Sequence, residues 1–186
     1  ELNIKVNPNP RIYVEKKQIK AARKKLKIKS YEKNILLGIG GSGPTKRVPA
    51  KKFIEFMELT LKKYKSRFFL AAGKNTEEQK ILKEIMKSKY KSKCYKLDNF
   101  PIRKILPIIS NCKIAICNDS SFSHLSAALG IKTIVLMTDT PLMYGSYSKH
   151  MHAIVPDGEK TVTHNSLGKN KINPKKIFNK FIKLIK

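Results

Sequence analysis

Two short stretches of the sequence combine residue types that bind anions. The first, CNDSSFSHLSAALG at 117–130, places an acid, serines and a histidine directly after an apolar run. The second, GIGGSGPTKR at 38–47, is a glycine-rich loop followed by a hydroxyl and two cations. Backbone amides at a helix N-terminus or in a glycine-rich turn bind phosphate, and hydroxyl and cationic groups strengthen such a site. The two stretches therefore predict binding of a phosphate-bearing ligand.

The acid of the first stretch, Asp119, comes at the end of the apolar run KIAIC, so we expect it at the carboxyl end of a buried strand. Ser120 to Ser123 would begin the next helix, where unpaired amides and the helix dipole favour an anion. His124 falls in the first turn and would face the same ligand. For an isolated acid and serine, a simple helix cap would be the better interpretation. The second anion-binding loop favours a site.

The glycine-rich stretch also matches G-x-G-x-x-G, the fingerprint of dinucleotide-binding folds. Pro44 and Pro49 delay the helix that should contain the third glycine, and the next predicted strand ends in AAGK, without an acid for a ribose. A Walker A loop is disfavoured, because Pro44 and Thr45 stand where Lys and Ser or Thr are required. What remains is a loop with free backbone amides, Thr45, Lys46 and Arg47, which fits a phosphate site and a plain turn equally well.

Two other kinds of site are disfavoured. A Ser–His–acid hydrolase needs its nucleophile on a strained turn and its histidine on a different loop, whereas here these residues share one turn and no G-x-S-x-G occurs. His150 and His152 lie two residues apart without a supporting Cys or acid cluster, so we expect surface loop residues there. We therefore expect no metal and no cofactor.

The elements that would position the two stretches alternate along the chain. Apolar runs predict strands at 34–40, 67–73, 93–97, 113–117, 132–137 and 153–155. Helical periodicity predicts helices at 49–64, 76–88, 101–110, with a kink at Pro107, 121–129 and 173–186, with Asn173 as cap and Pro174 in the first turn. Such alternation implies parallel pairing and right-handed crossovers. The fold class is therefore α/β, a Rossmann-like doubly wound parallel sheet.

Ligands of such sheets bind at the carboxyl ends of the strands, where the strand order reverses. The loops at 40–49, 73–76 and 118–122 are expected at that edge. The amphipathic stretch at 15–29, with two prolines before it, predicts a linker and a first helix over residues 1–33. Residues 34–186 would then form one nucleotide-binding domain.

The composition is strongly basic. Forty Lys and Arg against 13 Asp and Glu give a formal net charge of +27, which attracts phosphate-bearing partners or an anionic membrane surface. The excess is nearly all Lys, spread along the chain beside abundant Ile and Asn, as an AT-rich coding sequence would give. No aromatic-rich basic strand accompanies it, so a nucleic-acid partner is disfavoured.

Two features of the sequence indicate the cellular compartment: its three cysteines and its lack of long apolar runs. Cys94, Cys112 and Cys117 form no C-x-x-C and lie in or beside apolar segments, as free thiols do in a reducing cytoplasm. No apolar run approaches the roughly 20 residues that span a bilayer, and the first residues do not resemble a signal peptide. We expect a soluble, cytoplasmic protein and, because the sequence opens without Met, a piece of a longer polypeptide.

Both stretches resemble parts of one enzyme family. SNCKIAICNDSSFSHLSAALGIKTIVLMTDTPLMYGSY, at 110–147, resembles the C-terminal domain of glycosyltransferase family 9, the ADP-heptose:lipopolysaccharide heptosyltransferases. GSGPTKRVPAKKF, at 41–53, resembles a second donor-site loop of that family, and RIYVEKKQIKAARKKL, at 11–26, resembles its interdomain helix. The resemblance covers almost the whole chain and implies the C-terminal, donor-binding half of a GT-B glycosyltransferase.

The resemblance also implies an activity: inverting, metal-independent transfer of a sugar from a nucleotide-sugar, with ADP-heptose expected, to a lipopolysaccharide-type glycolipid at the inner face of the inner membrane. The catalytic base would be an Asp of an N-terminal acceptor domain that this chain lacks, so the chain alone is expected to be inactive. It implies these residue roles: Ser42, Thr45, Lys46, Arg47, Ser120, Ser121 and His124 for the diphosphate, Asp119 for the sugar, and Gly73, Asn75 and Phe100 for the nucleoside.

The sequence departs from the family pattern at three positions. Ser121 replaces a usual glycine and could crowd the diphosphate, Asn75 stands where a ribose-binding acid is common, and Val48 replaces a frequent Trp. Ser121 and the missing N-terminal half keep a non-catalytic nucleotide-sugar-binding or nucleotide-binding module open as an alternative. A dinucleotide-dependent oxidoreductase, based on the glycine loop, and a nucleic-acid binder, based on charge, are weaker alternatives.

Overall fold

The computed structural model describes residues 9–186, so the first eight residues of the predicted linker lie outside it. Within that range, six parallel strands form one sheet in the order β3-β2-β1-β4-β5-β6. The strands are β1 (Lys33–Gly38), β2 (Ser66–Ala71), β3 (Cys94–Lys96), β4 (Ile114–Asn118), β5 (Thr133–Leu136) and β6 (Met151–Ile154). The helices are α1 (Lys16–Lys25), α2 (Ala50–Lys63), α3 (Thr76–Lys87), α4 (Ile102–Ile109), α5 (Ser121–Ala128) and α6 (Pro174–Ile185). This strand order is that of a Rossmann-like doubly wound sheet, which confirms the predicted fold class.

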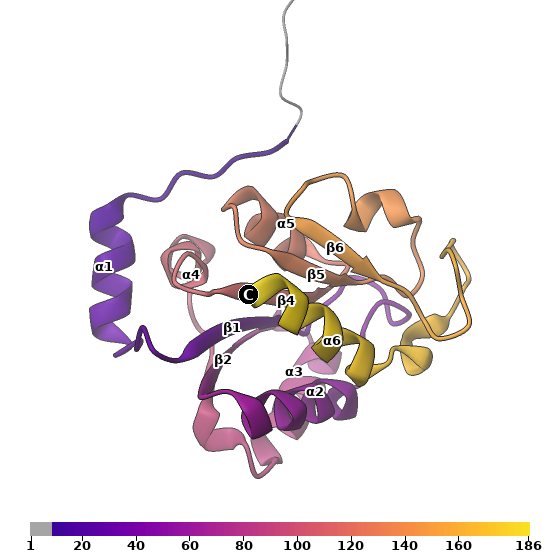
Figure 1. Cartoon of the computed structure of the whole chain (residues 1–186), viewed down its shortest axis with the longest axis horizontal. Coiled ribbons are helices and arrows are strands. Elements are labelled where there is room, and N and C mark those ends of the chain that lie inside the picture. Colours follow the sequence, from indigo (N-terminus) through magenta and orange to yellow (C-terminus); the bar gives the residue numbers. More distant parts are fainter. Residues whose placement is uncertain (1–8) are drawn as a thin grey trace, which may run out of the picture.

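Helices cover both faces of the sheet (Figure 1). On one face, Phe53 and Phe56 of α2 and Phe181 of α6 pack with Ile35 and Leu37 of β1. On the other face, side chains of α1, α4 and α5 pack on Leu36, Phe69 and their neighbours. A strand that is buried on both sides must be apolar at successive positions. This explains why the short runs NILLG and KIAIC are strands and not helix faces.

The central strand β1 and its two neighbours, β2 and β4, end side by side at the same edge of the sheet. Gly38 of β1 pairs with Ala71 of β2 and with Cys117 of β4. A Cβ at Gly38 would lie 2.6 Å from Cys117 Sγ, so only glycine fits where these two strands pass. The loops after β1, β2 and β4 therefore share one edge of the sheet, as predicted.

The predicted strands and the five helices after residue 33 are confirmed, with ends shifted by up to two residues, and the stretch predicted as the first helix forms α1. The last strand begins at Met151, so His152 lies half-buried in β6 and the prediction of a loop residue is wrong there. The cause is pairing with β5, where His152 lies opposite Ile134. The predicted cap of α6 is confirmed, because Asn173 Oδ1 accepts the Lys175 amide at 2.9 Å.

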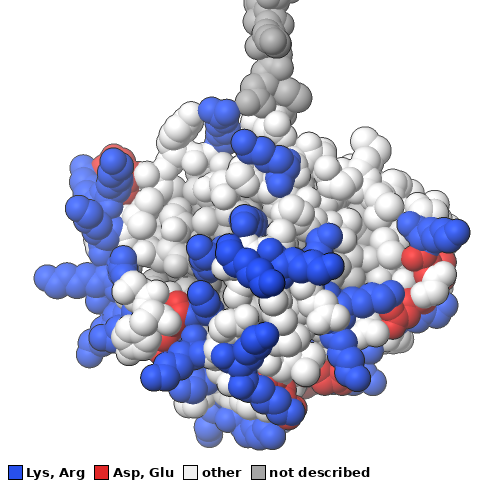
Figure 2. All heavy atoms as spheres, viewed as in Figure 1, with Lys and Arg blue, Asp and Glu red and all other residues white. Residues whose placement is uncertain are grey.

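Lys and Arg side chains are spread over the face seen in Figure 2, with few acids among them. They lie over several elements and do not gather in a single stripe. None of the helices between residues 9 and 186 has both the length and the hydropathy needed to cross a bilayer.

Candidate functional site

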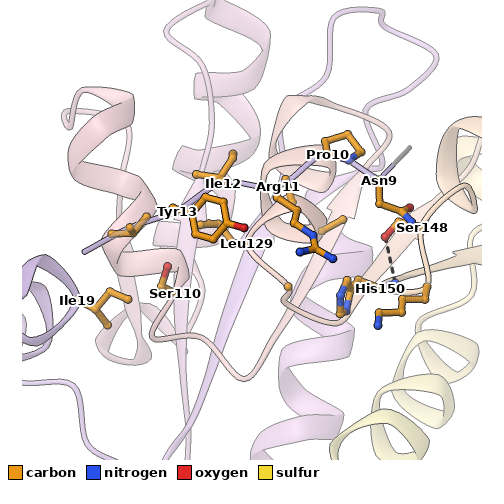
Figure 3. Close-up of a pocket in the computed structure, with 15 residues that line it drawn as sticks. Asn9, Pro10, Arg11, Ile12, Tyr13, Ile19, Ser110, Leu129, Ser148 and His150 are labelled. Carbon is orange, nitrogen blue, oxygen red and sulfur yellow. Dashed lines mark hydrogen bonds between the residues drawn. The ribbon is translucent and has the colours of Figure 1, made fainter. Parts of the chain in front are cut away.

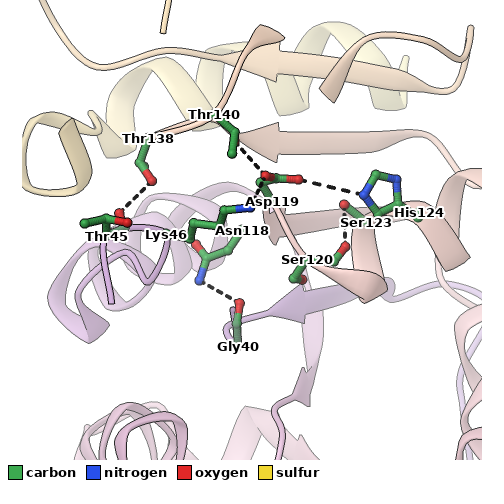
Figure 4. Close-up of polar contacts among 10 residues, drawn as sticks. All are labelled: Gly40, Thr45, Lys46, Asn118, Asp119, Ser120, Ser123, His124, Thr138 and Thr140. Carbon is green, nitrogen blue, oxygen red and sulfur yellow. Dashed lines mark hydrogen bonds and ion pairs between the residues drawn. The ribbon is translucent and has the colours of Figure 1, made fainter. Parts of the chain in front are cut away.

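The candidate site lies where the strand order reverses, between β1 and β4 (Figure 4). The loop after β1 brings Lys46, the end of β4 brings Asp119, and the segment after β5 brings Thr140. His124 joins them from the first turn of α5. We call Lys46, Asp119, His124 and Thr140 the Asp119 cluster.

Asp119 is the centre of this cluster and is 5% exposed. Its Oδ2 accepts hydrogen bonds from Lys46 Nζ at 2.9 Å and from Thr140 Oγ1 at 2.6 Å. A buried carboxylate needs such partners, because desolvation without pairing is costly. The Lys46 side chain remains 24% exposed, so it borders solvent.

His124 lies on the other side of the carboxylate. Its Nε2 is 3.8 Å from Asp119 Oδ1, and its Nδ1 is 2.9 Å from the hydroxyl of Tyr147. The two rings are stacked, with centroids 5.7 Å apart. Asp119, Lys46 and His124, which the sequence predicts at one edge, are thus brought together.

The N-terminus of α5 adds backbone amides beside the cluster. Ser120 occupies the N-cap position, yet its side chain accepts no hydrogen bond from the helix. Its Oγ is buried and has no partner among the residues described, whereas Ser121 is exposed. Ser120 is therefore the N-cap residue by position, but its side chain makes no capping hydrogen bond.

A buried asparagine connects the two stretches. Asn118 Nδ2 donates to the carbonyls of Ile39 at 2.9 Å and Gly40 at 3.1 Å, and its Oδ1 accepts the Val48 amide at 3.4 Å. Asn118 is fully buried. It therefore holds both ends of the loop that carries Lys46. Sequence analysis did not assign it this role.

The glycine-rich loop differs from the prediction in one respect. The Gly41 amide is not free, because it donates to Glu78 Oε1 at 3.3 Å, and the Gly73 amide donates to Glu78 Oε2. Arg47 Nη1 donates to the Gly41 carbonyl at 3.2 Å, while Ser42 is exposed. The anion that the amides of Gly41 and Gly73 bind is thus an internal carboxylate, which sequence analysis missed.

Two of the three residues predicted for the nucleoside adjoin this carboxylate. Asn75 caps α3 by accepting the Glu78 amide at 3.0 Å and donates from Nδ2 to Glu78 Oε1 at 2.7 Å. Gly73 accepts from Gln79 Nε2 at 2.8 Å. Phe100 instead packs near Tyr95, with ring centroids 6.1 Å apart.

Thr45 anchors the loop to the segment after β5. Its carbonyl accepts from Thr138 Oγ1 at 2.8 Å. The hydrogen bond from the Thr45 side chain, followed by those from the amides of residues 165–167, lowers the pKa of Asp139. Thr138 directly follows the strand predicted at 132–137 and Thr140 comes two residues later, so the rule that located Asp119 would have found them.

A separate hollow of about 570 Å³ lies at the opposite end of the sheet (Figure 3). It is bordered by residues 9–14 and by the residues that precede β5 and β6, such as Gly130 and His150. It contains none of the residues predicted for the ligand. Among the residues described, no group of three or more His, Cys, Asp or Glu side chains is placed to hold a metal ion.

The fold and the site define a class of protein: a Rossmann-like α/β domain with charged side chains gathered at the edge where the strand order reverses. A family model described as glycosyltransferase family 9 (heptosyltransferase) matches residues 3–172. The chain therefore belongs to glycosyltransferase family 9, as the resemblance of the two stretches indicated.

Known heptosyltransferases are similar to this chain in sequence and in fold. Lipopolysaccharide heptosyltransferase 1 of Campylobacter coli is 25% identical over 164 residues, covering 84% of this chain and 46% of that protein. The structure of E. coli ADP-heptose lps heptosyltransferase II matches with a TM-score of 0.77 and 19% identity over 95% of this chain and 53% of that one. E. coli heptosyltransferase WaaC with ADP matches with a TM-score of 0.66 and 17% identity, over 89% and 48%. The chain spans about half the length of these GT-B relatives.

Proposed function

We propose that the chain is the donor-binding half of a heptosyltransferase-type glycosyltransferase and binds an ADP-sugar, with ADP-heptose as the expected substrate. The observation that carries the proposal is the pairing of Lys46 with Asp119 across the switch point between β1 and β4, 2.9 Å apart. Family membership supports the class of reaction. The solved structure of E. coli WaaC, which has the same fold, contains ADP, and this supports ADP as the nucleotide of the proposed donor.

In this proposal the diphosphate lies between Lys46 and the N-terminus of α5. Lys46 supplies a cation, the amides of α5 supply a positive dipole end, and the unpartnered Ser120 hydroxyl supplies a further hydrogen bond. Asp119 would accept hydrogen bonds from sugar hydroxyls. The diphosphate would also be lined by Ser42, Thr45, Arg47, Ser121 and His124. The nucleoside would be lined by Gly73, Asn75 and Phe100.

The reaction would invert the anomeric centre. The acceptor hydroxyl attacks the anomeric carbon, the bond from that carbon to the diphosphate oxygen breaks, and the hydroxyl proton passes to a base that we assign to the other half of the enzyme. Lys46 and the α5 amides would stabilise the negative charge that develops on the departing diphosphate. The chain by itself would then bind substrate without transferring it, and the scheme uses no metal.

The acceptor in this proposal is a lipopolysaccharide-type glycolipid at the cytoplasmic face of the inner membrane. Curated and solved heptosyltransferase relatives support the acceptor class. The net charge of +27 suits a surface that carries phosphorylated lipid.

Calorimetric titration tests the proposal. ADP-heptose, UDP-glucose, NAD and a short DNA duplex are titrated into the chain at two salt concentrations, and then into Lys46→Ala and Asp119→Ala. We expect ADP-heptose to bind and Lys46→Ala to weaken it about tenfold or more, since a charge-assisted hydrogen bond contributes roughly 1.5–3 kcal/mol. Lys83→Ala removes one exposed lysine of α3 and should bind as the wild type does.

Two results would contradict the proposal. One is an absence of ADP-heptose binding, and the other is unchanged affinity in both site variants. If only DNA bound, with a steep salt dependence, the nucleic-acid alternative would be favoured instead.

A further inference from the structure

Tyr147 lies beside the Asp119 cluster, in the segment that joins β5 to β6. Its hydroxyl oxygen is 2.9 Å from His124 Nδ1, and the two rings are stacked at an interplanar angle of 15°. The segment is held in place, because Gly145 lies so close to Met137 that a Cβ there would overlap its side chain. In addition, Ser146 Oγ donates to the Leu142 carbonyl at 2.8 Å. The backbone before Tyr147 is therefore held, and its ring, 43% exposed, stacks on the imidazole.

Two neighbours of His124 favour the same imidazole tautomer. A neutral imidazole carries one N–H and one lone pair, and the groups around it decide which nitrogen has the proton. Nε2 faces Asp119 Oδ1 at 3.8 Å, and a lone pair there would point at a carboxylate. With the proton on Nε2, Nδ1 accepts the hydrogen bond of the Tyr147 hydroxyl. A phenol hydroxyl is protonated at neutral pH and can donate this hydrogen bond, and partial burial raises the pKa of Tyr147 further.

The Nε2–H group remains available to a ligand. At 3.8 Å, Asp119 Oδ1 attracts it but lies beyond the range of a hydrogen bond. The His124 side chain is 38% exposed and stands in the first turn of α5, next to the helix amides. A phosphate oxygen only accepts hydrogen bonds, so an imidazole can serve it only through an N–H.

We propose that Tyr147 is a positioning residue of the nucleotide-sugar site: its hydroxyl donates to His124 Nδ1, fixes the Nε2–H tautomer and directs that N–H to the diphosphate. This inference rests on the function proposed above and adds to it a residue from a different loop. Tyr147 itself acts through His124 and makes no contact with the diphosphate. The stacked ring also limits rotation of the imidazole away from the site.

Nitrogen-15 NMR of the ligand-free chain tests the tautomer. In the wild type we expect His124 as the Nε2–H form, with Nδ1 in the chemical-shift range of a hydrogen-bonded acceptor. Tyr147→Phe keeps the stacked ring and removes the hydroxyl, so the Nδ1 signal should move to the range of a free acceptor. Tyr144→Phe is the matched control, because this tyrosine is exposed in the same segment, and it should leave the signal unchanged. An unchanged Nδ1 signal in Tyr147→Phe would overturn the inference.

A double-mutant cycle tests the link to the ligand. Tyr147→Phe should weaken the binding of ADP-heptose about three- to tenfold, as expected for one hydrogen bond. In a His124→Ala background it should cause no further loss of affinity. The inference would be overturned, with the proposed function intact, if Tyr147→Phe bound ADP-heptose as tightly as the wild type. It would also be overturned if Tyr147→Phe weakened binding by the same factor in the His124→Ala background as in the wild type. A chain that shows the Nε2–H form but binds no ADP-heptose would instead contradict the proposed function, and with it the ligand assigned to this N–H.

Discussion

Two buried carboxylates lie at the same edge of the sheet and have partners of different kinds. Glu78, 7% exposed, accepts from the backbone amides of Gly41 and Gly73 and from the Asn75 side chain. Asp119, 5% exposed, accepts from the Lys46 and Thr140 side chains. Backbone amides are fixed by the fold, whereas a lysine moves by rotating its side chain. Glu78 therefore forms a permanent part of the fold, and the Asp119 cluster is able to exchange partners.

This difference assigns separate tasks to the two halves of the edge. The amides of Gly41 and Gly73 already bind an anion, so they are not available to a phosphate. On the Asp119 side, Lys46 borders solvent and Ser120 Oγ has no partner within residues 9–186. A phosphate-bearing ligand would therefore be held by the α5 side of the edge, while Glu78 keeps the loops after β1 and β2 together.

The largest expected effect is that of Glu78→Gln on stability. The substitution removes the charge that three donors share, and the new amide group places N–H against N–H at one of them. Because the site is buried, we expect the free energy of unfolding to fall by about 2–3 kcal/mol. Urea denaturation followed by circular dichroism measures this change.

Glu84→Gln is the control for this comparison, because Glu84 is an exposed carboxylate on the same helix. It should change the free energy of unfolding by no more than about 0.5 kcal/mol. If Glu78→Gln were as mild as the control, the proposed permanent role of Glu78 would be wrong.

A smaller loss of stability is expected for Asp119→Asn. Lys46 can turn to solvent when the carboxylate charge is removed, and Thr140 keeps an oxygen acceptor, so we expect a loss of about 1 kcal/mol. The same variant should weaken the binding of ADP-heptose, because it changes the groups that face the sugar. Urea denaturation and calorimetric titration of one protein sample separate the two effects. A stability loss as large as that of Glu78→Gln would remove the distinction between the two carboxylates.

The sheet and part of the site follow from local patterns in the sequence. The runs NILLG and KIAIC are apolar at successive positions, and their alternation with helical periods predicts a parallel sheet and the edge where its strands end. Asp119 comes directly after β4 and Lys46 lies in the loop after β1, so topology predicts that both lie at the same edge of the sheet. Thr140 follows the same rule and was missed only because a threonine after a strand carries a weaker signal than an acid.

Glu78 and Tyr147 could not be predicted in this way. An acid in the first turn of a helix is ordinary, because it complements the helix dipole, and nothing local shows that Glu78 reaches the Gly41 and Gly73 amides. Tyr147 meets His124 across 23 residues, through the path of an irregular segment. Such contacts depend on tertiary packing and not on periodicity. They also explain why the Gly41 amide, predicted to be free, is not.

The smallest expected effect concerns a third carboxylate at this edge, that of the half-buried Asp139. Hydrogen bonds from Thr45 and from the backbone lower the pKa of Asp139, so the native state favours its charged form. Its contribution to stability is present above the unfolded pKa of about 4 and is lost as the pH falls through the lower native value. Because solvent screens the group, we expect Asp139→Asn to cost about 0.5 kcal/mol or less at pH 6. The difference from wild type, measured by urea denaturation at pH 6, 4 and 3, should shrink with acid, since general repulsion among the lysines affects both proteins equally. A difference that grew with acid would show that Asp139 is not stabilised in its charged form and that Thr45 is held by other contacts.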